Sequence, residues 1–148
     1  MNLRTLHESD CYEIRSVVNE WWGGRQMTHL LPRLFFEHFQ NTSFVMMSGS
    51  KIVGFVIGFI SPSKENEAYI HFVGVHPDFR KQGVAHRLYN KFFEEVRERG
   101  CDTIRCITSP VNVKSIDFHH RMGFTADYAP DYEGPDEDRI LFVRYLNL

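Results

Sequence analysis

The chain has 148 residues, 43% of them hydrophobic and 24% charged, with a formal net charge of -2 at pH 7. This length predicts one domain, residues 1–148, with a sizeable core. The near-neutral charge gives no reason to expect nucleic acid or an anionic membrane surface as the main partner.

The cysteines and the first residues of the chain bear on its compartment. Cys11, Cys101 and Cys106 are odd in number and lack the spacing of metal ligands, which favours a reducing cytoplasm and no bound metal. Residues 1–6 are too short and too polar for a signal peptide, and no apolar run is long enough to cross a bilayer. The sequence therefore predicts a soluble cytoplasmic protein.

The chain begins with the pattern of a strand followed by a helix. Residues 2–6 read as a short strand, and Ser9 or Asp10 stands where the N-cap of a first helix is expected. The apolar positions of that helix follow helical spacing, at Ile14, Val17, Val18 and Trp21. Residues 22–27 break the pattern and predict a loop.

A second helix and three strands are expected next. Pro32 suits the first turn of a helix. The apolar residues that follow it are Leu34, Phe35, Phe36 and Phe39. Residues 43–47 and 51–60 predict two strands joined by a hairpin turn. Residues 69–75 alternate and are rich in β-branched and aromatic side chains, which predicts a buried strand.

A basic turn and a long helix follow this strand. After residues 76–79 the turn continues as Arg80-Lys81-Gln82-Gly83-Val84-Ala85. The apolar residues then recur at helical spacing, at Val84, Leu88, Phe92 and Val96. Gly100 ends the predicted helix.

A glycine-bearing turn between a strand and a helix is a common phosphate site. The first N–H groups of the helix lack partners, and the helix dipole favours an anion there. Arg80 and Lys81 add positive charge, and Gly83 lets the backbone approach a ligand closely. An ordinary strand–turn–helix unit with a solvated basic turn explains these residues equally well. Other phosphate motifs fit poorly, because the turn lacks the Gly-Lys-Ser/Thr of a P-loop and the triple glycine of a dinucleotide fingerprint.

The second half of the chain reads as strand, helix, strand, strand. Residues 103–108 predict a strand, and Asn112 caps a helix that Gly123 ends. Residues 124–128 and 139–146 read as a closing antiparallel pair. The predicted fold class is therefore α/β, with a mixed, mostly antiparallel sheet of six or seven strands and helices on both faces.

Residues 75–85 resemble the acyl-CoA signature of the GNAT superfamily of N-acetyltransferases. In that signature a Gln or Arg, two free positions, Gly, one free position and a Gly or Ala follow a strand end. Arg80, Gly83 and Ala85 fill the three fixed positions. Residues 112–124 resemble the family's second CoA-side segment, a helix opened by Asn and closed by Gly-Phe. The resemblance covers nearly the whole chain and implies a single GNAT domain.

This resemblance implies an enzyme that binds acetyl-CoA, without a metal, and transfers its acetyl group directly to an amine. The family's strands at positions 69–75 and 103–108 splay apart to admit the pantetheine arm of the cofactor. The implied cofactor contacts are the backbone amides of Val73, Val75, Gln82, Gly83, Val84 and Ala85, the side chains of Arg80 and Lys81, and Asn112. Homodimers are common in the family.

Two histidines are candidate proton carriers. The family usually places a Tyr acid about four residues before the Gly-Phe pair, where this chain has His119. A histidine can donate a proton to the thiolate or shuttle one, and a surface histidine that fills the space of the tyrosine is the alternative. His71 is the candidate base, although a satisfied core histidine explains it as well. Tyr69 stands where some members have a Glu base but has an ordinary pKa of ~10, and Glu67 is the fallback.

The acceptor is expected to be the amine of a small molecule or a peptide. By resemblance, the far wall of the cleft includes Trp22 and Arg25 from one loop and Tyr132 from another. Aromatic rings beside the acidic residues 136–138 suit a cationic amine, whereas Arg25 suits an acceptor carboxylate. Two other functions stay open. One is a catalytically silent acyl-CoA-binding or sensory module, since the usual Tyr and Glu are missing. The other is a nucleotide-phosphate binder that uses the same turn.

Overall fold

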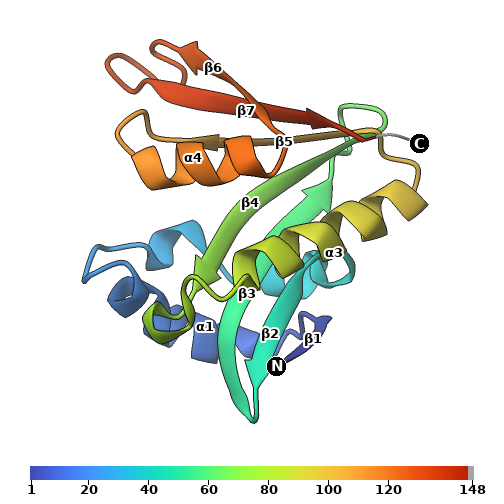
Figure 1. The fold of residues 1–148 in the computed structure, drawn as a ribbon, viewed down its shortest axis with the longest axis vertical. Helices are drawn as coiled ribbons and strands as arrows, with labels where there is room; N and C mark the ends of the chain where they lie inside the picture. Colours follow the sequence, from blue (N-terminus) through green and yellow to red (C-terminus); the bar gives the residue numbers. More distant parts are fainter. Residues whose placement is uncertain (147–148) are drawn as a thin grey trace. The chain divides into compact units, whose positions relative to one another are not determined.

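Seven strands are hydrogen-bonded in the order β1-β2-β3-β4-β5-β7-β6 in the computed structural model, which describes residues 1–146. The strands are β1 (Asn2–Thr5), β2 (Phe44–Ser48), β3 (Lys51–Ile60), β4 (Glu67–Val75), β5 (Thr103–Thr108), β6 (Thr125–Ala129) and β7 (Arg139–Tyr145). The α-helices are α1 (Asp10–Trp21), α2 (Leu34–His38), α3 (Val84–Glu98) and α4 (Val113–Arg121), all coloured by sequence in Figure 1. The pairs β1–β2, β2–β3, β5–β7 and β6–β7 are antiparallel, and β4–β5 is parallel. The predicted mixed, mostly antiparallel sheet is confirmed.

The described residues form two compact units. The first contains Met1–Phe59 and Ile70–Val96, and the second contains Ile60–Tyr69 and residues 97–146. Strand β4 and helix α3 each pass from one unit to the other. Strand β4 begins at Glu67, two residues before its predicted start.

In the first unit, helices pack on both faces of the sheet because side chains alternate along β3. Phe55 and Ile57 join a buried cluster with α1, whose members include Ile14 and Val18. The intervening Gly54 faces α3 instead. A Cβ atom built on Gly54 would lie 2.5 Å from Cγ1 of Val84 and 3.3 Å from Cδ1 of Leu88. The start of α3, which Figure 1 shows crossing in front of β3, therefore lies directly against the strand.

The start of α1 differs from the sequence prediction. Ser9 stands at the N-cap, but its side chain makes no capping hydrogen bond. The Asp10 carboxylate accepts hydrogen bonds from two Arg4 nitrogens, at 2.9 and 3.0 Å, and from the His7 N–H at 2.8 Å. The predicted side-chain cap is wrong because this 6% exposed carboxylate instead joins the end of β1 to the helix.

The second helix is also shorter than its apolar residues suggest. It covers only Leu34–His38. At its start, the Phe35 N–H donates to the Pro32 carbonyl at 3.1 Å. Phe39 falls outside the helix, where its ring packs 5.1 Å from that of Phe59. Tertiary packing of the rings decides the end of this helix.

The second unit is built on β5, β7 and β6, with α4 joined to them through β6. The Arg144 guanidinium on β7 donates a hydrogen bond to the Met122 carbonyl at the end of α4. At the beginning of β4, three residue pairs link Glu67–Tyr69 in parallel to Thr103–Arg105 of β5. Within residues 1–146, none of the helices combines the length and apolar content needed to cross a membrane.

All three cysteines are reduced and buried. Cys106 is 4% exposed and Cys101 is fully buried. Burial raises the pKa of both thiols. Deprotonation of these side chains is therefore disfavoured in the folded protein.

We expect Gly54→Val to lower the free energy of unfolding by about 3 kcal/mol, because the new side chain overlaps Val84. Gly49→Val is the matched control, since nothing lies within 4 Å of a Cβ at that turn. The control should lose about 1 kcal/mol through its positive φ alone. Urea unfolding measures both, and equal losses would contradict close packing of β3 against α3.

Candidate functional site

The turn between β4 and α3 contains two residues with left-handed backbone conformation, which residues other than glycine rarely adopt. It begins with a 3-10 turn, Pro77–Phe79, in which the Asp78 N–H donates to Nδ1 of His76 at 3.0 Å. Lys81 has a φ of 63° and Gly83 a φ of 77°, both in the left-handed region. Alternation of left-handed with ordinary residues directs successive N–H groups toward the same side of a chain, which is the geometry of an anion-binding nest.

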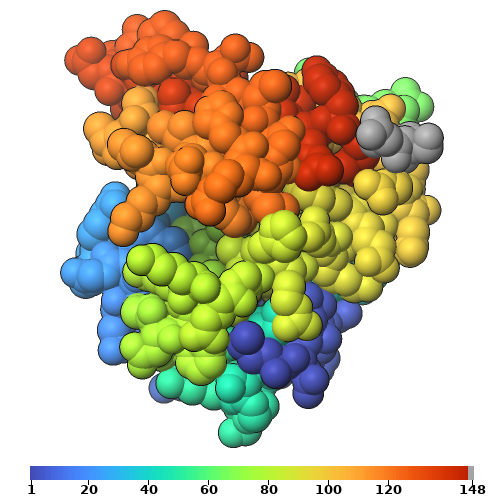
Figure 2. Space-filling view, viewed as in Figure 1, coloured from blue at the N-terminus to red at the C-terminus, as the bar shows by residue number. Residues whose placement is uncertain are grey.

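The N–H groups at the start of α3 have no protein acceptor. In the described chain, residues 82–85 donate no backbone hydrogen bond, and the first bond of the helix runs from the Arg87 N–H to the Gly83 carbonyl at 3.0 Å. Nothing lies within 4 Å of a Cβ built on Gly83. Residues 81–83 are exposed, and the yellow-green chain in Figure 2 lies at the surface of the displayed face. The turn can therefore receive an anion without rearrangement.

The Arg80 side chain turns back toward the protein. Its Nη2 donates to the Trp21 carbonyl at 2.6 Å, and its Nε lies 3.4 Å from the Val75 carbonyl. Gln82 uses its side-chain amide to donate to the Asp78 carbonyl at 3.2 Å. Both predicted cations are exposed, but Arg80 is anchored to α1 and β4 by these hydrogen bonds.

Strand β4 presents the predicted residues on one of its two sides. Val73 and Val75 share the half-buried side with His71, while Phe72 and Gly74 are buried on the other. A Cβ on Gly74 would lie 2.6 Å from the Phe55 ring and 3.2 Å from the Trp22 ring. Glycine at this position thus permits close aromatic packing.

His71 is held in a well-defined environment within the first unit. Its Nε2 is hydrogen-bonded to the Leu30 carbonyl, which requires a proton on Nε2 because a carbonyl only accepts. Its ring stacks on Phe35 with centroids 4.2 Å apart. Burial lowers the pKa of His71, and the bond to Leu30 opposes this effect. These contacts satisfy the histidine structurally and leave Nδ1 as the basic nitrogen of the neutral ring.

The two alternative bases on β4 are poorly suited to that role. Burial raises the pKa of Tyr69 to about 12, with Cys106, Tyr132 and Glu133 acting in the same direction. Tyr69 is therefore a neutral phenol at physiological pH. The Glu67 carboxylate is paired with Arg105, at 2.8 Å from its Nε.

His119 is buried in the second unit, so the alternative of a surface histidine is wrong. It is 5% exposed, and its ring stacks on Phe142 with centroids 4.3 Å apart. Its Nδ1 donates to the Ser115 carbonyl at 2.7 Å and lies 3.2 Å from the Ser115 hydroxyl. Burial lowers the pKa of His119, partly offset by the bond to Ser115. At neutral pH the ring is therefore uncharged, with its proton on Nδ1.

Asn112 performs the capping role that its position predicts. Its side-chain oxygen accepts from the Ser115 N–H at 3.2 Å, and its amide nitrogen donates to the Thr108 hydroxyl at 3.2 Å. The cap thereby connects the end of β5 to the start of α4. Its contact to a cofactor stays a prediction.

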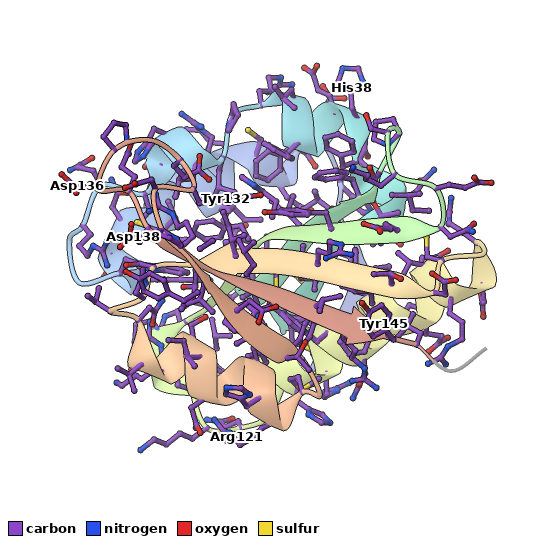
Figure 3. The ribbon with its side chains drawn as sticks, turned by 90° about the horizontal axis from the view of Figure 1, so that it is seen from above. His38, Arg121, Tyr132, Asp136, Asp138 and Tyr145 are labelled. Carbon is purple, nitrogen blue, oxygen red and sulfur yellow. The ribbon has the colours of Figure 1, made fainter. Side chains whose placement is uncertain are left out.

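The predicted acceptor residues lie on two loops, one in each unit. Trp22 is half-buried, with its ring 5.0 Å from that of Phe72, whereas Arg25 is exposed. In the second unit, Figure 3 labels Tyr132, Asp136 and Asp138 on the β6–β7 loop. Tyr132 is 52% exposed. The Asp138 carboxylate holds this loop, because it accepts from the Tyr128 hydroxyl and from the Asp131 N–H.

Two cavities described in the first unit do not include residues 80–85. One of about 360 Å³ is lined by Glu13, Glu20, Trp21, Lys51 and His76, among others. The second, of about 680 Å³, lies along α1 beside Tyr12, Arg15 and Arg33. Among the described residues, no group of three His, Cys, Asp or Glu side chains is arranged to hold a metal ion.

Three contacts were not predicted from the sequence: the Trp21 carbonyl for Arg80, the Leu30 carbonyl for His71 and Ser115 for His119. Only the third has a signal in the sequence, because residues four apart meet on one helix face. The other two acceptors are backbone carbonyls of residues distant in the sequence, and every residue type has such a carbonyl.

Comparison with known proteins adds sequence and fold relatives. The model of the acetyltransferase (GNAT) family matches residues 8–124. An uncharacterised N-acetyltransferase of Methanocaldococcus jannaschii is 36% identical over 85 residues, which are 55% of this chain. That match spans only 38% of the relative's length.

Solved structures share the fold. The ribosomal-protein-S18-alanine N-acetyltransferase of Escherichia coli has a TM-score of 0.81 at 18% identity, covering 99% of this chain and 94% of the other. The yncA protein of Salmonella typhimurium, solved with its cofactor acetyl-CoA, has a TM-score of 0.78 at 21% identity, covering 100% and 95%. At such identities the likeness concerns the fold alone.

The buried His119 should make stability depend on pH. Because its folded pKa is below the ordinary value of ~6.5, the unfolded chain takes up the proton first. The contribution is complete above pH ~6.5 and is lost as the pH falls toward the folded pKa. A tenfold difference in proton affinity between the two states corresponds to about 1.4 kcal/mol.

Urea unfolding between pH 7.5 and 5 measures this dependence. The decline in the free energy of unfolding should be shallower for His119→Phe than for the wild type, because the variant has no proton to take up at this position. An exposed histidine on α3 gives the control His86→Gln, whereas His120 is unsuitable because it contributes to the lowered pKa of His119. A wild-type slope in His119→Phe would contradict the burial of an uncharged ring.

Proposed function

Because the chain belongs to the GNAT acetyltransferase family, we propose that it transfers the acetyl group of acetyl-CoA to the amine of a small molecule or peptide. The amine nitrogen forms a bond to the acetyl carbonyl carbon, and the bond from that carbon to sulfur breaks. The proton lost by the amine ends on the thiolate of CoA. The proposal places the reaction in the cytoplasm, as the cysteine content predicts.

The observation that carries this proposal is the row of unpaired N–H groups at residues 82–85. A diphosphate is the part of CoA that such donors suit, because each oxygen accepts several hydrogen bonds and the helix dipole favours its charge. Gly83 leaves the space that the phosphate needs, and Lys81 adds a positive charge. The backbone amides of Val73 and Val75 remain the proposed contacts for the acetyl carbonyl and the pantetheine arm, and Asn112 a contact for that arm.

His119 is proposed to shuttle a proton rather than to act as a resident acid. Its lowered pKa leaves it uncharged, and its Nδ1 proton is held by the Ser115 carbonyl. Nε2 must therefore gain a proton before the ring can protonate a thiolate. The amine provides that proton, either directly or through His71 and water. The bond between His71 and Leu30 leaves Nδ1 of His71 as its accepting atom.

The acceptor is proposed from the loops that carry Trp22, Arg25 and Tyr132. These loops offer an exposed cation and an exposed phenol, which suit an amine whose neighbouring groups include a carboxylate. A peptide N-terminus has that chemistry where an acidic side chain flanks it, and a free amino acid has it through its own carboxylate. A second function, silent binding of acyl-CoA, is favoured by the absence of a free carboxylate base on β4, because Glu67 is paired with Arg105.

We expect Gly83→Val to weaken CoA binding at least about 100-fold. A β-branched residue disfavours a φ of 77°, and its side chain fills the open space beside the N–H groups. Calorimetric titration with CoA measures the affinity. The control Gly49→Val carries a similar φ of 61° in a hairpin and should bind like the wild type. Unchanged binding by Gly83→Val would show that the diphosphate lies elsewhere.

Release of the CoA thiol from acetyl-CoA tests the enzyme directly, with a panel of amino acids, peptides and polyamines. We expect turnover with at least one amine, and a loss of about 100-fold or more in kcat for His119→Phe with little change in CoA affinity. Tight CoA binding without turnover on any amine would instead support the silent module. Competition by ATP but not by CoA would support a nucleotide-phosphate binder.

A further inference from the structure

We propose that Arg80 is a positioning residue that connects the turn between β4 and α3 (residues 76–83, the cofactor turn) to the end of α1, so that CoA binding at this turn orders the Trp22–Met27 loop. This inference rests on the proposed function, because it takes CoA as the ligand of the turn. It gives Arg80 a task other than contributing charge to the diphosphate.

The contact is directional and lies at a helix terminus. Nη2 of Arg80 donates to the Trp21 carbonyl at 2.6 Å, and Trp21 is the last residue of α1. Carbonyls in the last turn of a helix lack partners within it and carry the negative end of its dipole. The last turn of α1 contains no basic residue of its own. Arg80 therefore supplies, from the cofactor turn, the cation that this helix end lacks.

The same arginine also fixes where the cofactor turn leaves β4. Its Nε lies 3.4 Å from the carbonyl of Val75, the last residue of the strand. One side chain thus spans the end of β4, the beginning of the turn and the end of α1. A bound diphosphate would restrain the backbone next to Arg80. The hydrogen bond from Arg80 to the Trp21 carbonyl would extend this restraint to the end of α1.

Aromatic packing reinforces the connection beyond Trp21. The Trp21 ring lies 5.5 Å from the His76 ring, and the Trp22 ring lies 5.0 Å from that of Phe72 on β4. The indole of Trp22 also reaches the space that a side chain at Gly74 would need. Trp21 therefore packs near the residue that follows β4, and Trp22, just after α1, packs near β4 itself.

The loop that follows is exposed, although the N–H groups of Gly23, Gly24 and Arg25 donate to nearby backbone carbonyls. Residues 23–26 are exposed, and Gly23 and Gly24 have positive φ values. At the far end, the Asn19 side-chain oxygen accepts from the N–H groups of Met27, at 2.6 Å, and Thr28, at 3.1 Å. At the near end, Arg80 holds the Trp21 carbonyl. Because Trp22 and Arg25 are proposed acceptor residues, a loop ordered by CoA would prepare the acceptor side before the amine arrives.

Hydrogen exchange with and without saturating CoA tests both ends of this connection in one experiment. In the wild type, we expect CoA to slow exchange about tenfold or more in peptides covering residues 82–88 and also in peptides covering residues 20–27. Protection of residues 82–88 reports the proposed cofactor site. Protection of residues 20–27 reports whether CoA binding at the turn also orders the loop after α1.

Two variants test whether Arg80 is responsible for the effect of CoA on residues 20–27. Arg80→Met removes both donors while keeping a long apolar stem, and Lys81→Met removes a cation from the adjacent position of the same turn without changing the contact with α1. At saturating CoA, Arg80→Met should keep protection of residues 82–88 and lose that of residues 20–27. Lys81→Met should need more CoA to reach saturation, because it loses one positive charge at the turn, and at saturation it should keep both. Arg80→Lys, which retains one donor, should restore part of the protection in residues 20–27.

The outcomes are distinguishable. If CoA protects neither region of the wild type, the proposed function fails and this inference fails with it. If it protects residues 82–88 alone, only the inference is overturned. Retained protection of residues 20–27 in Arg80→Met would also overturn the inference. So would equal losses of this protection in Arg80→Met and Lys81→Met, because they would show that only the positive charge of the turn matters. Circular dichroism confirms that each variant is folded at the temperature of the exchange.

Discussion

The structure depends on one constraint, which is that the chain leaves β4 and enters α3 with its N–H groups turned outward and unpaired. This requires left-handed backbone at Lys81 and at Gly83, of which only the glycine adopts it without steric cost. A non-glycine residue in that region has to be stabilised by its surroundings. The anchoring of Arg80 on one side and the packing of Val84 against Gly54 on the other provide that stabilisation.

Much of the fold could be predicted because its elements are locally consistent. The alternation along β4 and the helical spacing of Val84, Leu88 and Phe92 each match one structure, and the glycines stand at the turns that need them. The Asn112 cap was predictable for the same reason, since its partner is three residues away. The predicted cap of α1 by Ser9 or Asp10 was wrong because the Asp10 carboxylate binds Arg4 on the preceding strand instead, and Ser9 makes no capping bond.

The candidate site was predictable in its residues but not in their protonation. The sequence places His71 on a strand and His119 on a helix. It does not reveal that the first ring is half-buried and the second buried, or that carbonyls fix their tautomers. Those carbonyls belong to Leu30 and Ser115, and the stacking partner of His119 comes from β7, far along the chain. The electrostatic state of a histidine follows from such surroundings more than from its position in a motif.

The interior position of the three sulfhydryl groups has a practical consequence for following the reaction. Disulfide-exchange dyes react with a thiolate, and the native chain presents none at its surface because Cys11, Cys101 and Cys106 are enclosed. The leaving group of acetyl transfer is itself a thiol. Any colour that develops while the protein stays folded therefore belongs to the liberated coenzyme. When coenzyme is left out, the same colour marks the moment at which the fold begins to open.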